Sequence, residues 1–168
     1  MVLYFGTEEH WDAPDNLKAI LDIPKGLDRY INNIHINVFE IAWLTEAQVN
    51  KFTSDFRIVA NFFVNKRKNK DYIPDDRTQI KHVDEVLKLL SVMTGDRRYE
   101  VLLADKEKVS NMCDVAQRLE DRGVKRGREE ERLELSESIH RLKAGETPES
   151  IIESGVGKET VEVALTCL

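Results

Sequence analysis

The sequence has little cysteine and no long apolar run, and both shortages narrow the class of protein. Two of its 168 residues are cysteines, Cys113 and Cys167, and their separation fits neither a CxxC motif nor zinc-ligand spacing. We therefore expect two reduced thiols in a cytoplasmic protein. No stretch approaches about 18 consecutive apolar residues and no signal peptide is visible, so we expect no membrane association.

Histidine is equally scarce, which bears on metal binding. The four histidines, His10, His35, His82 and His140, are scattered, and no two have the spacing of metal ligands. The histidines therefore predict no metal site.

The balance of charges disfavours a surface that generally attracts nucleic acid. The net charge is −6, so contact with DNA would need a local basic patch. Hydrophobic residues make up 41% of the chain and charged residues 33%, against usual values of about 45–50% and about 25%. Part of the chain is therefore expected to be a solvated helix.

The chain opens with a short apolar run, Val2-Leu3-Tyr4-Phe5, closed by Gly6. A continuous run of strand-forming residues predicts a strand buried on both faces, with neighbours on each side in a sheet. Because such a strand normally lies in the middle of a fold, we expect the chain to begin part-way through a domain.

Further along, residues 34–44 predict a second strand, since they are rich in β-branched residues. Thr45 and Gln48 then form a capping-box pattern before a helix expected over residues 46–67. Another apolar stripe predicts a helix over residues 79–93 and ends at Gly95. The expected fold is α+β and mostly helical, with a small mixed sheet covered by these helices over residues 1–105.

The remaining sequence predicts two helical parts. Residues 106–144 are charged and sparsely apolar, which is typical of a linker helix; Gly123 and Gly127 make a hinge plausible within it. Charges of both signs recur at i,i+4 spacing over residues 118–134, so we interpret this face as self-neutralising. Residues 145–168 predict a small helix-turn-helix-like hairpin that starts at Thr147-Pro148-Glu149.

Several segments carry a resemblance to a known family. They are Val2-Leu3-Tyr4-Phe5-Gly6, His10-Trp11-Asp12, Leu17-Lys18-Ala19-Ile20-Leu21-Asp22, Ile36-Asn37-Val38-Phe39-Glu40 and Ser54-Asp55-Phe56-Arg57-Ile58-Val59-Ala60. Over roughly residues 2–105 the chain resembles the C-terminal portion of the recombination-promoting nuclease and transposase family, within the PD-(D/E)XK nuclease superfamily. Residues 143–165 resemble the helical hairpin that often ends these proteins.

The resemblance implies metal-dependent DNA cleavage by the full-length family, with Mg²⁺ as cofactor. In that family the metal-binding aspartate and the Glu-x-Lys or Glu-x-Gln strand lie upstream of the strand that residues 2–5 resemble. The resemblance therefore implies a truncated or split member of the family. We expect it to bind no cofactor and to be inactive as this chain alone.

Three places could still offer a nuclease carboxylate. Asp75 and Asp76 follow a proline but are expected in a solvated loop, and Glu46 is expected to cap a helix. Glu40 is the most serious catalytic candidate because it follows apolar residues of a strand. However, Ala42 stands two positions on, where an amine or amide would be required. The weak candidate for a catalytic residue is therefore Glu40, and no metal ligand is predicted.

Two kinds of partner remain open. The candidate DNA-binding residues are Arg57, Lys66, Arg67, Lys68 and Lys70, whose cations could contact phosphates, although a solvated helix end explains most of them more simply. The alternative function is a non-catalytic interaction module. Its exposed sheet edge would pair with a second copy, as a homo-oligomer, or with a separately encoded N-terminal half.

Overall fold

The computed structural model is mostly helical, with 57% of its residues in helices and a sheet of two parallel strands. It describes residues 1–168, except the side chains of residues 105 and 106. The chain divides into two compact units, Met1–Gln117 and Arg118–Leu168, with the division inside one long helix. Among the described residues, no helix is long and apolar enough to cross a membrane.

The sheet pairs β1 (Val2–Tyr4) with β2 (Val38–Glu40), so that Leu3 lies beside Phe39. The expectation that the first strand is buried on both faces is wrong, because the side chains of Leu3 and Phe39 are 41% and 46% exposed. The other face is partly covered, and Phe5 continues from β1 to pack its ring against Phe63 of the first unit's central helix, with ring centroids 5.0 Å apart.

The second strand is shorter than the sequence predicts. Residues 34–37 stay outside it; an antiparallel bridge joins His35 to Asn16, and the carbonyl of Asn37 accepts the N–H of Val2 at 2.8 Å. After Glu40 the chain turns at once into the 3₁₀ helix η2 (Ile41–Trp43), which buries Ile41 and Ala42. β-branched residues therefore indicate where β2 lies, but burial under the helices ends it early.

The predicted helix over residues 46–67 is two helices, α2 (Glu46–Val49) and α3 (Phe56–Lys68). Thr45 and Gln48 form the predicted capping box at the start of α2. α3 buries a wide apolar stripe and is the centre of the first unit's core; its buried residues are Ile58, Val59, Ala60, Phe62, Phe63 and Val64.

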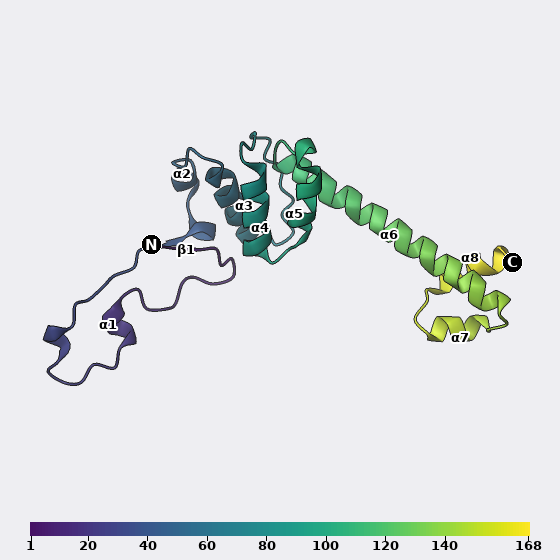
Figure 1. Cartoon of the computed structure of the whole chain (residues 1–168), viewed down its shortest axis with the longest axis horizontal. Coiled ribbons are helices and arrows are strands. Elements are labelled where there is room, and N and C mark those ends of the chain that lie inside the picture. Colours follow the sequence, from purple (N-terminus) through teal and green to yellow (C-terminus); the bar gives the residue numbers. More distant parts are fainter. The chain divides into compact units, whose positions relative to one another are not determined.

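The rest of the first unit packs around α3. Helix α4 (Val83–Thr94) buries Leu87 and Leu90 and ends at Gly95, whose φ of +70° is the left-handed cap that glycine adopts without strain. A short α5 (Arg98–Val101) and the 3₁₀ helix η3 (Leu102–Lys108) follow (Figure 1). Two small helical pieces, α1 (Leu17–Ile20) and η1 (Asp28–Tyr30), lie between the strands in sequence.

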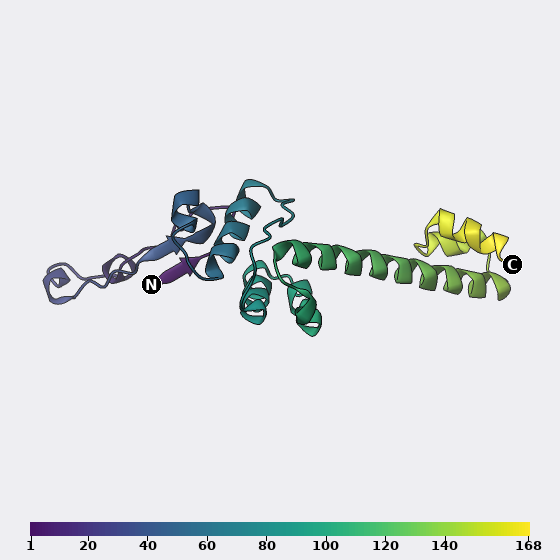
Figure 2. The same ribbon diagram turned by 90° about the horizontal axis from the view of Figure 1, so that it is seen from above.

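Helix α6 (Met112–Lys143) runs unbroken through Gly123 and Gly127, so the glycines do not interrupt it. In the second unit, α7 (Pro148–Glu153) and α8 (Lys158–Thr166) fold back against the C-terminal end of α6 in both views (Figure 1 and Figure 2). Ile151, Val161 and Ala164 are buried in this contact together with Ser138.

Candidate functional site

Glu40, the candidate catalytic residue, is engaged in holding the loop that follows β1. Its carboxylate accepts the backbone N–H of Trp11 at 2.7 Å and lies 3.0 Å from Nδ1 of His10. The hydrogen bond from the Trp11 backbone is the chief reason that the pKa of Glu40 is lowered from its ordinary value. The carboxylate therefore stays ionised and serves as an anchor for residues 10 and 11.

No other acidic side chain joins Glu40 in a metal-binding group. Within the described part of the chain, no set of three or more His, Cys, Asp or Glu side chains is placed to hold a metal ion. Glu46 lies in the first turn of α2, and Asp76 lies in a loop where its carboxylate accepts the N–H of Thr78 at 2.8 Å.

Beside Glu40, three planar side chains form a stack that no sequence pattern predicts. The His10 ring lies 3.6 Å from the Trp43 ring, and the guanidinium of Arg67 lies 4.4 Å from the same ring. Both groups therefore pack against the indole of Trp43. The stack joins the loop after β1, η2 and the end of α3. These three segments lie far apart in the sequence, so no short motif connects them.

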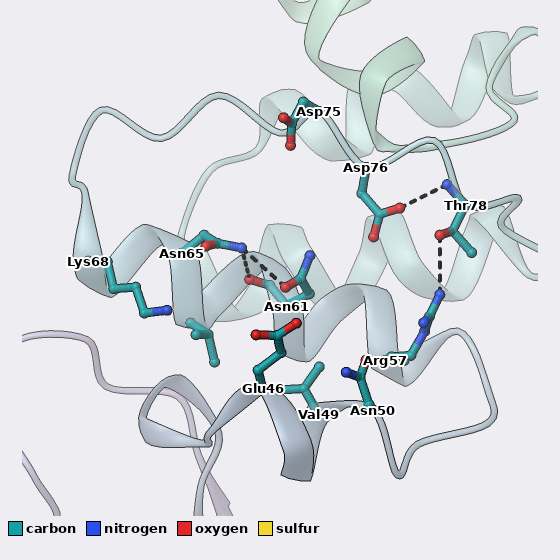
Figure 3. A pocket seen from close by; sticks show the side chains of 11 residues that line it. Glu46, Val49, Asn50, Arg57, Asn61, Asn65, Lys68, Asp75, Asp76 and Thr78 are labelled. Carbon is teal, nitrogen blue, oxygen red and sulfur yellow. Dashed lines mark hydrogen bonds between the residues drawn. The ribbon is translucent and has the colours of Figure 1, made fainter.

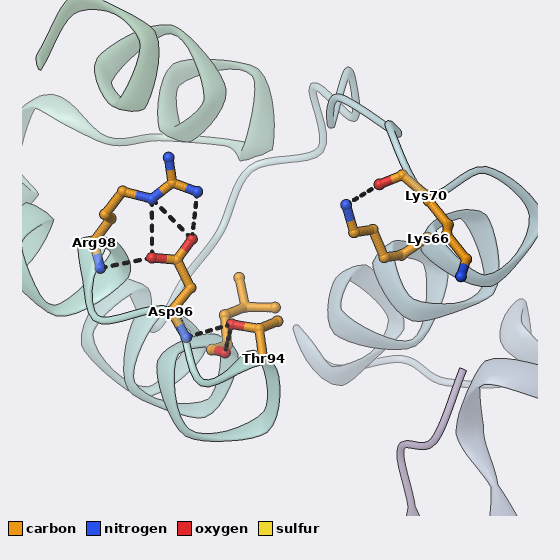
Figure 4. A network of polar contacts seen from close by, with 6 residues as sticks. Lys66, Lys70, Thr94, Asp96 and Arg98 are labelled. Atoms are coloured by element: carbon orange, nitrogen blue, oxygen red, sulfur yellow. Dashed lines mark hydrogen bonds and ion pairs between the residues drawn. The ribbon is translucent and has the colours of Figure 1, made fainter. Parts of the chain in front are cut away.

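Three cations of the predicted DNA-binding set, Arg67, Lys70 and Lys66, have acceptors within the fold. The Nε of Arg67 donates to the carbonyl of Ala42 at 2.8 Å, so the guanidinium is committed to the fold. Lys70 pairs with Glu8, Nζ to Oε2, at 3.0 Å. Lys66 donates to the carbonyl of Lys70 (Figure 4). Of these three cations, only Lys70 is paired with a carboxylate, whereas Arg67 and Lys66 donate to backbone carbonyls.

The other two predicted cations, Arg57 and Lys68, line a polar groove. It lies between α2, α3 and the loop at residues 75–78, has a volume of about 470 Å³, and is lined by Glu46, Val49, Asn50, Arg57, Asn61, Val64, Asn65, Lys68, Asp75, Asp76 and Thr78 (Figure 3). One terminal nitrogen of Arg57 donates to the hydroxyl of Thr78 at 3.2 Å and closes one end of the groove. A second hollow of about 390 Å³ begins on the other side of this bond, where Phe52 and Lys81 are part of the lining.

The groove is nearly balanced in charge, and this limits what it can bind. Its two cations face three carboxylates, those of Glu46, Asp75 and Asp76. A phosphate would meet these acids as well as Arg57 and Lys68, so the groove does not favour a polyanion. The amides of Asn61 and Asn65 can both donate and accept, which suits a neutral or zwitterionic polar guest.

A second polar network lies at the turn between α4 and α5, away from any groove that we describe. The Arg98 guanidinium makes three hydrogen bonds to the Asp96 carboxylate, the shortest from its terminal nitrogen to Oδ2 at 2.7 Å (Figure 4). These hydrogen bonds lower the pKa of Asp96 below its ordinary value. Asp96 also accepts the N–H of Arg98, so the pair fixes the start of α5 and has a structural role.

Comparisons of the chain with protein-family models, with curated proteins and with solved structures each found no match.

Proposed function

We propose that this chain is a non-catalytic part of a metal-dependent DNA nuclease of the PD-(D/E)XK type, and that further strands add to its small sheet. What supports this is the sheet itself. Leu3 and Phe39 lie side by side on one face and are 41% and 46% exposed, although both are large apolar residues. A sheet of two short strands is marginal in water, and its open edges pair readily with other strands.

The carboxylates of the chain indicate which part of the nuclease it would supply. Glu40 is held by Trp11 and His10, and the described residues offer no group of three metal ligands. Under this proposal the aspartate and glutamate that hold Mg²⁺ belong to the strands that complete the sheet. The present chain supplies the helical layer formed by α3 and α4 and the strands beside which the others align.

Incubation of the purified chain with supercoiled plasmid and Mg²⁺ or Mn²⁺ tests the absence of a catalytic site. The proposal predicts no nicking above that of a metal-free control. Metal-dependent cleavage by the chain that is lost in Glu40→Ala, while Glu46→Ala still cleaves, would show that the chain is itself catalytic.

A second candidate function, an oligomerisation module, is favoured by the same exposed pair of side chains. Here Leu3 and Phe39 of one copy would cover those of another. Light scattering coupled to size-exclusion chromatography distinguishes the two, measured at about 0.5 M salt so that contacts between exposed charges are screened. A dimer that is lost in Leu3→Lys with Phe39→Lys would favour self-pairing. A monomer would leave the sheet open to a different chain.

A further inference from the structure

Residues 12–37 form an arm that connects β1 to β2, and this arm has no core of its own. The structure describes every residue of the arm, and none of them is buried. Nine are nevertheless large apolar residues, namely Leu17, Ile20, Leu21, Ile23, Leu27, Tyr30, Ile31, Ile34 and Ile36. Solvated loops are poor in such residues, and apolar side chains gathered on a surface mark a site of interaction. The composition of the arm is therefore that of a segment covered by a partner.

Backbone and polar groups hold the arm in shape. Its stem is a short antiparallel ribbon, in which the N–H of Leu17 donates to the carbonyl of Ile34 at 2.9 Å. Beyond the stem, Nζ of Lys18 donates to the carbonyl of Asp28 at 2.8 Å and so joins α1 to η1. Because polar bonds connect the two sides of the arm, its apolar side chains are left outside, which reverses the usual distribution in a folded protein.

The arm carries both an apolar hollow and an apolar projection. The hollow lies where α1 meets the stem, has a volume of about 210 Å³, and is lined by Pro14, Asn16, Leu17, Ile20, Ile34 and Ile36. An apolar cavity of about 150 Å³ admits benzene, so this hollow is large enough for an aromatic ring. The projection is Tyr30 of η1, farther along the arm (Figure 1), whose side chain is 69% exposed.

We propose that the arm is a self-association surface. The arm of a second copy lies antiparallel along it, with Tyr30 of each copy in the hollow of the other. One twofold axis makes the two contacts equivalent, so that each projection and each hollow is used. Asn16 is the polar residue of the lining, and its amide can pair with the Tyr30 hydroxyl, as a buried tyrosine requires.

The size and charge of the arm fit a second copy of the chain. Specific interfaces involve about 20–30 residues a side, and the arm has 26. A tyrosine held in an apolar pocket is a side chain of the kind that contributes most to such an interface. The arm has four acids and three cations, so its charge does not favour an anionic lipid surface.

This surface is separate from the exposed pair Leu3 and Phe39, and the proposal does not depend on the nuclease function. Sedimentation velocity of the full chain at about 0.5 M salt, where exposed charges are screened, tests it. The wild-type chain is expected to form a dimer, because burial of apolar side chains is not screened by salt. Leu3→Lys with Phe39→Lys should leave this dimer in place.

Two substitutions in the arm should weaken the dimer. Tyr30→Ala removes the projection and should raise the dissociation constant by at least about 30-fold, the effect of losing one interface anchor. Ile20→Ala widens the hollow and should also weaken the dimer. The matched control is Ile73→Ala, since Ile73 is 74% exposed and Ile20 is 64% exposed, but Ile73 lies outside the arm. Circular dichroism checks that each variant remains folded.

Disulfide cross-linking tests the antiparallel arrangement, in a background with Cys113→Ser and Cys167→Ser. Arg29→Cys lies next to the projection and Ala13→Cys next to the hollow, so both leave Tyr30 and the lining unchanged. Mixing the two variants should give a cross-linked pair faster than either variant alone.

Three results would overturn the proposal. The first is a wild-type chain that stays monomeric up to about 1 mM, including one that binds neutral lipid vesicles instead. The second is a dimer that Tyr30→Ala and Ile20→Ala weaken no more than Ile73→Ala does. The third is cross-linking of Arg29→Cys to itself in preference to Ala13→Cys.

Discussion

At the scale of single residues, several polar side chains connect segments that lie far apart in the sequence. Asp55 lies at the start of α3, but its carboxylate accepts the backbone N–H groups of Lys81 and His82 at 2.9 and 2.7 Å. It thereby holds His82, the N-cap residue of α4, and the residue before it, whereas α4 has no side-chain cap of its own. The side chain of Asp55 is only 11% exposed, so these bonds are partly shielded from water.

Replacing Asp55 with alanine should therefore destabilise the first unit by about 1–2 kcal/mol, because the N–H groups of Lys81 and His82 lose hydrogen bonds to a charged acceptor. Asp55→Asn keeps one acceptor and should lose less. Asp22→Ala, at an exposed aspartate, is the matched control and should change stability little. Urea denaturation followed by tryptophan fluorescence measures the change, since Trp11 and Trp43 both belong to this unit. Equal losses of stability in Asp55→Ala and Asp22→Ala would contradict a stabilising role for the bonds from Asp55 to Lys81 and His82.

A second polar pair, Arg141 and Glu146, connects the end of α6 to the C-terminal hairpin. Arg141 meets Glu146 through two hydrogen bonds of 2.8 and 2.6 Å, and Ser150 donates to the same carboxylate at 2.9 Å. The bonds from Arg141 are the first cause that lowers the pKa of Glu146 from 4.5 to about 2. Because the pKa is lower in the folded state, the stabilisation is fully present above about pH 4.5 and is lost as the pH falls toward 2.

We predict that Glu146→Gln destabilises the second unit at neutral pH and flattens its pH dependence between about 5 and 2. Thermal melts monitored by circular dichroism at several pH values measure this. The control is Glu149→Gln, which changes an exposed acid in the first turn of α7. It should leave most of the pH dependence of stability in place. If the stability of Glu146→Gln depended on pH as steeply as that of the wild type, this carboxylate would not be the source of the pH dependence.

At the scale of elements, the helix-capping patterns of the sequence are reliable and the strand patterns are less so. The capping box at Thr45, the glycine end of α4 and the proline start of α7 all occur as predicted, because each depends on local backbone geometry. The strand over residues 34–44 shortens to three residues, and the helix over residues 46–67 divides before Phe56. These ends depend on Trp43, Arg67 and Asp55, whose partners lie far away in sequence.

Helix α6 gives an element-scale prediction. Nothing lies within 4 Å of a Cβ built on Gly123 or Gly127, so alanine fits at both positions. Gly123→Ala and Gly127→Ala should each stabilise the helix by roughly 0.5–1 kcal/mol. Gly145→Ala is the opposing control, since its φ of +88° strains any side chain and should destabilise the hairpin. Thermal melts that show no gain for Gly123→Ala would point to a use for flexibility at this glycine.

At the scale of the whole molecule, charge and burial decide how the chain meets partners. The net charge is −6, and three of the five predicted DNA-binding cations, Lys66, Arg67 and Lys70, are engaged by acceptors in their own unit. The positions of basic residues could be read from the sequence, but their acceptors could not, since Ala42 and Glu8 come from other segments. The stack around Trp43 could not be predicted for the same reason, since its members come from segments far apart in the sequence.

DNA binding by the chain alone should therefore be weak and confined to low salt. Fluorescence anisotropy with a labelled duplex should show affinity that falls steeply as salt rises. Lys68→Ala, which removes a cation that lines the groove, should weaken binding more than Arg67→Lys, which keeps the positive charge at a residue bonded to the carbonyl of Ala42. Salt-independent binding would contradict this reading.

The claim on which the account depends most is that this chain has no metal site of its own and that a nuclease centre would need strands from elsewhere. Titration of the purified chain with Mn²⁺, followed by the electron paramagnetic resonance signal of the free ion, tests this most directly. The account predicts no stoichiometric binding and only weak association with scattered surface acids. One tight site per chain that disappears in Glu40→Ala would contradict it.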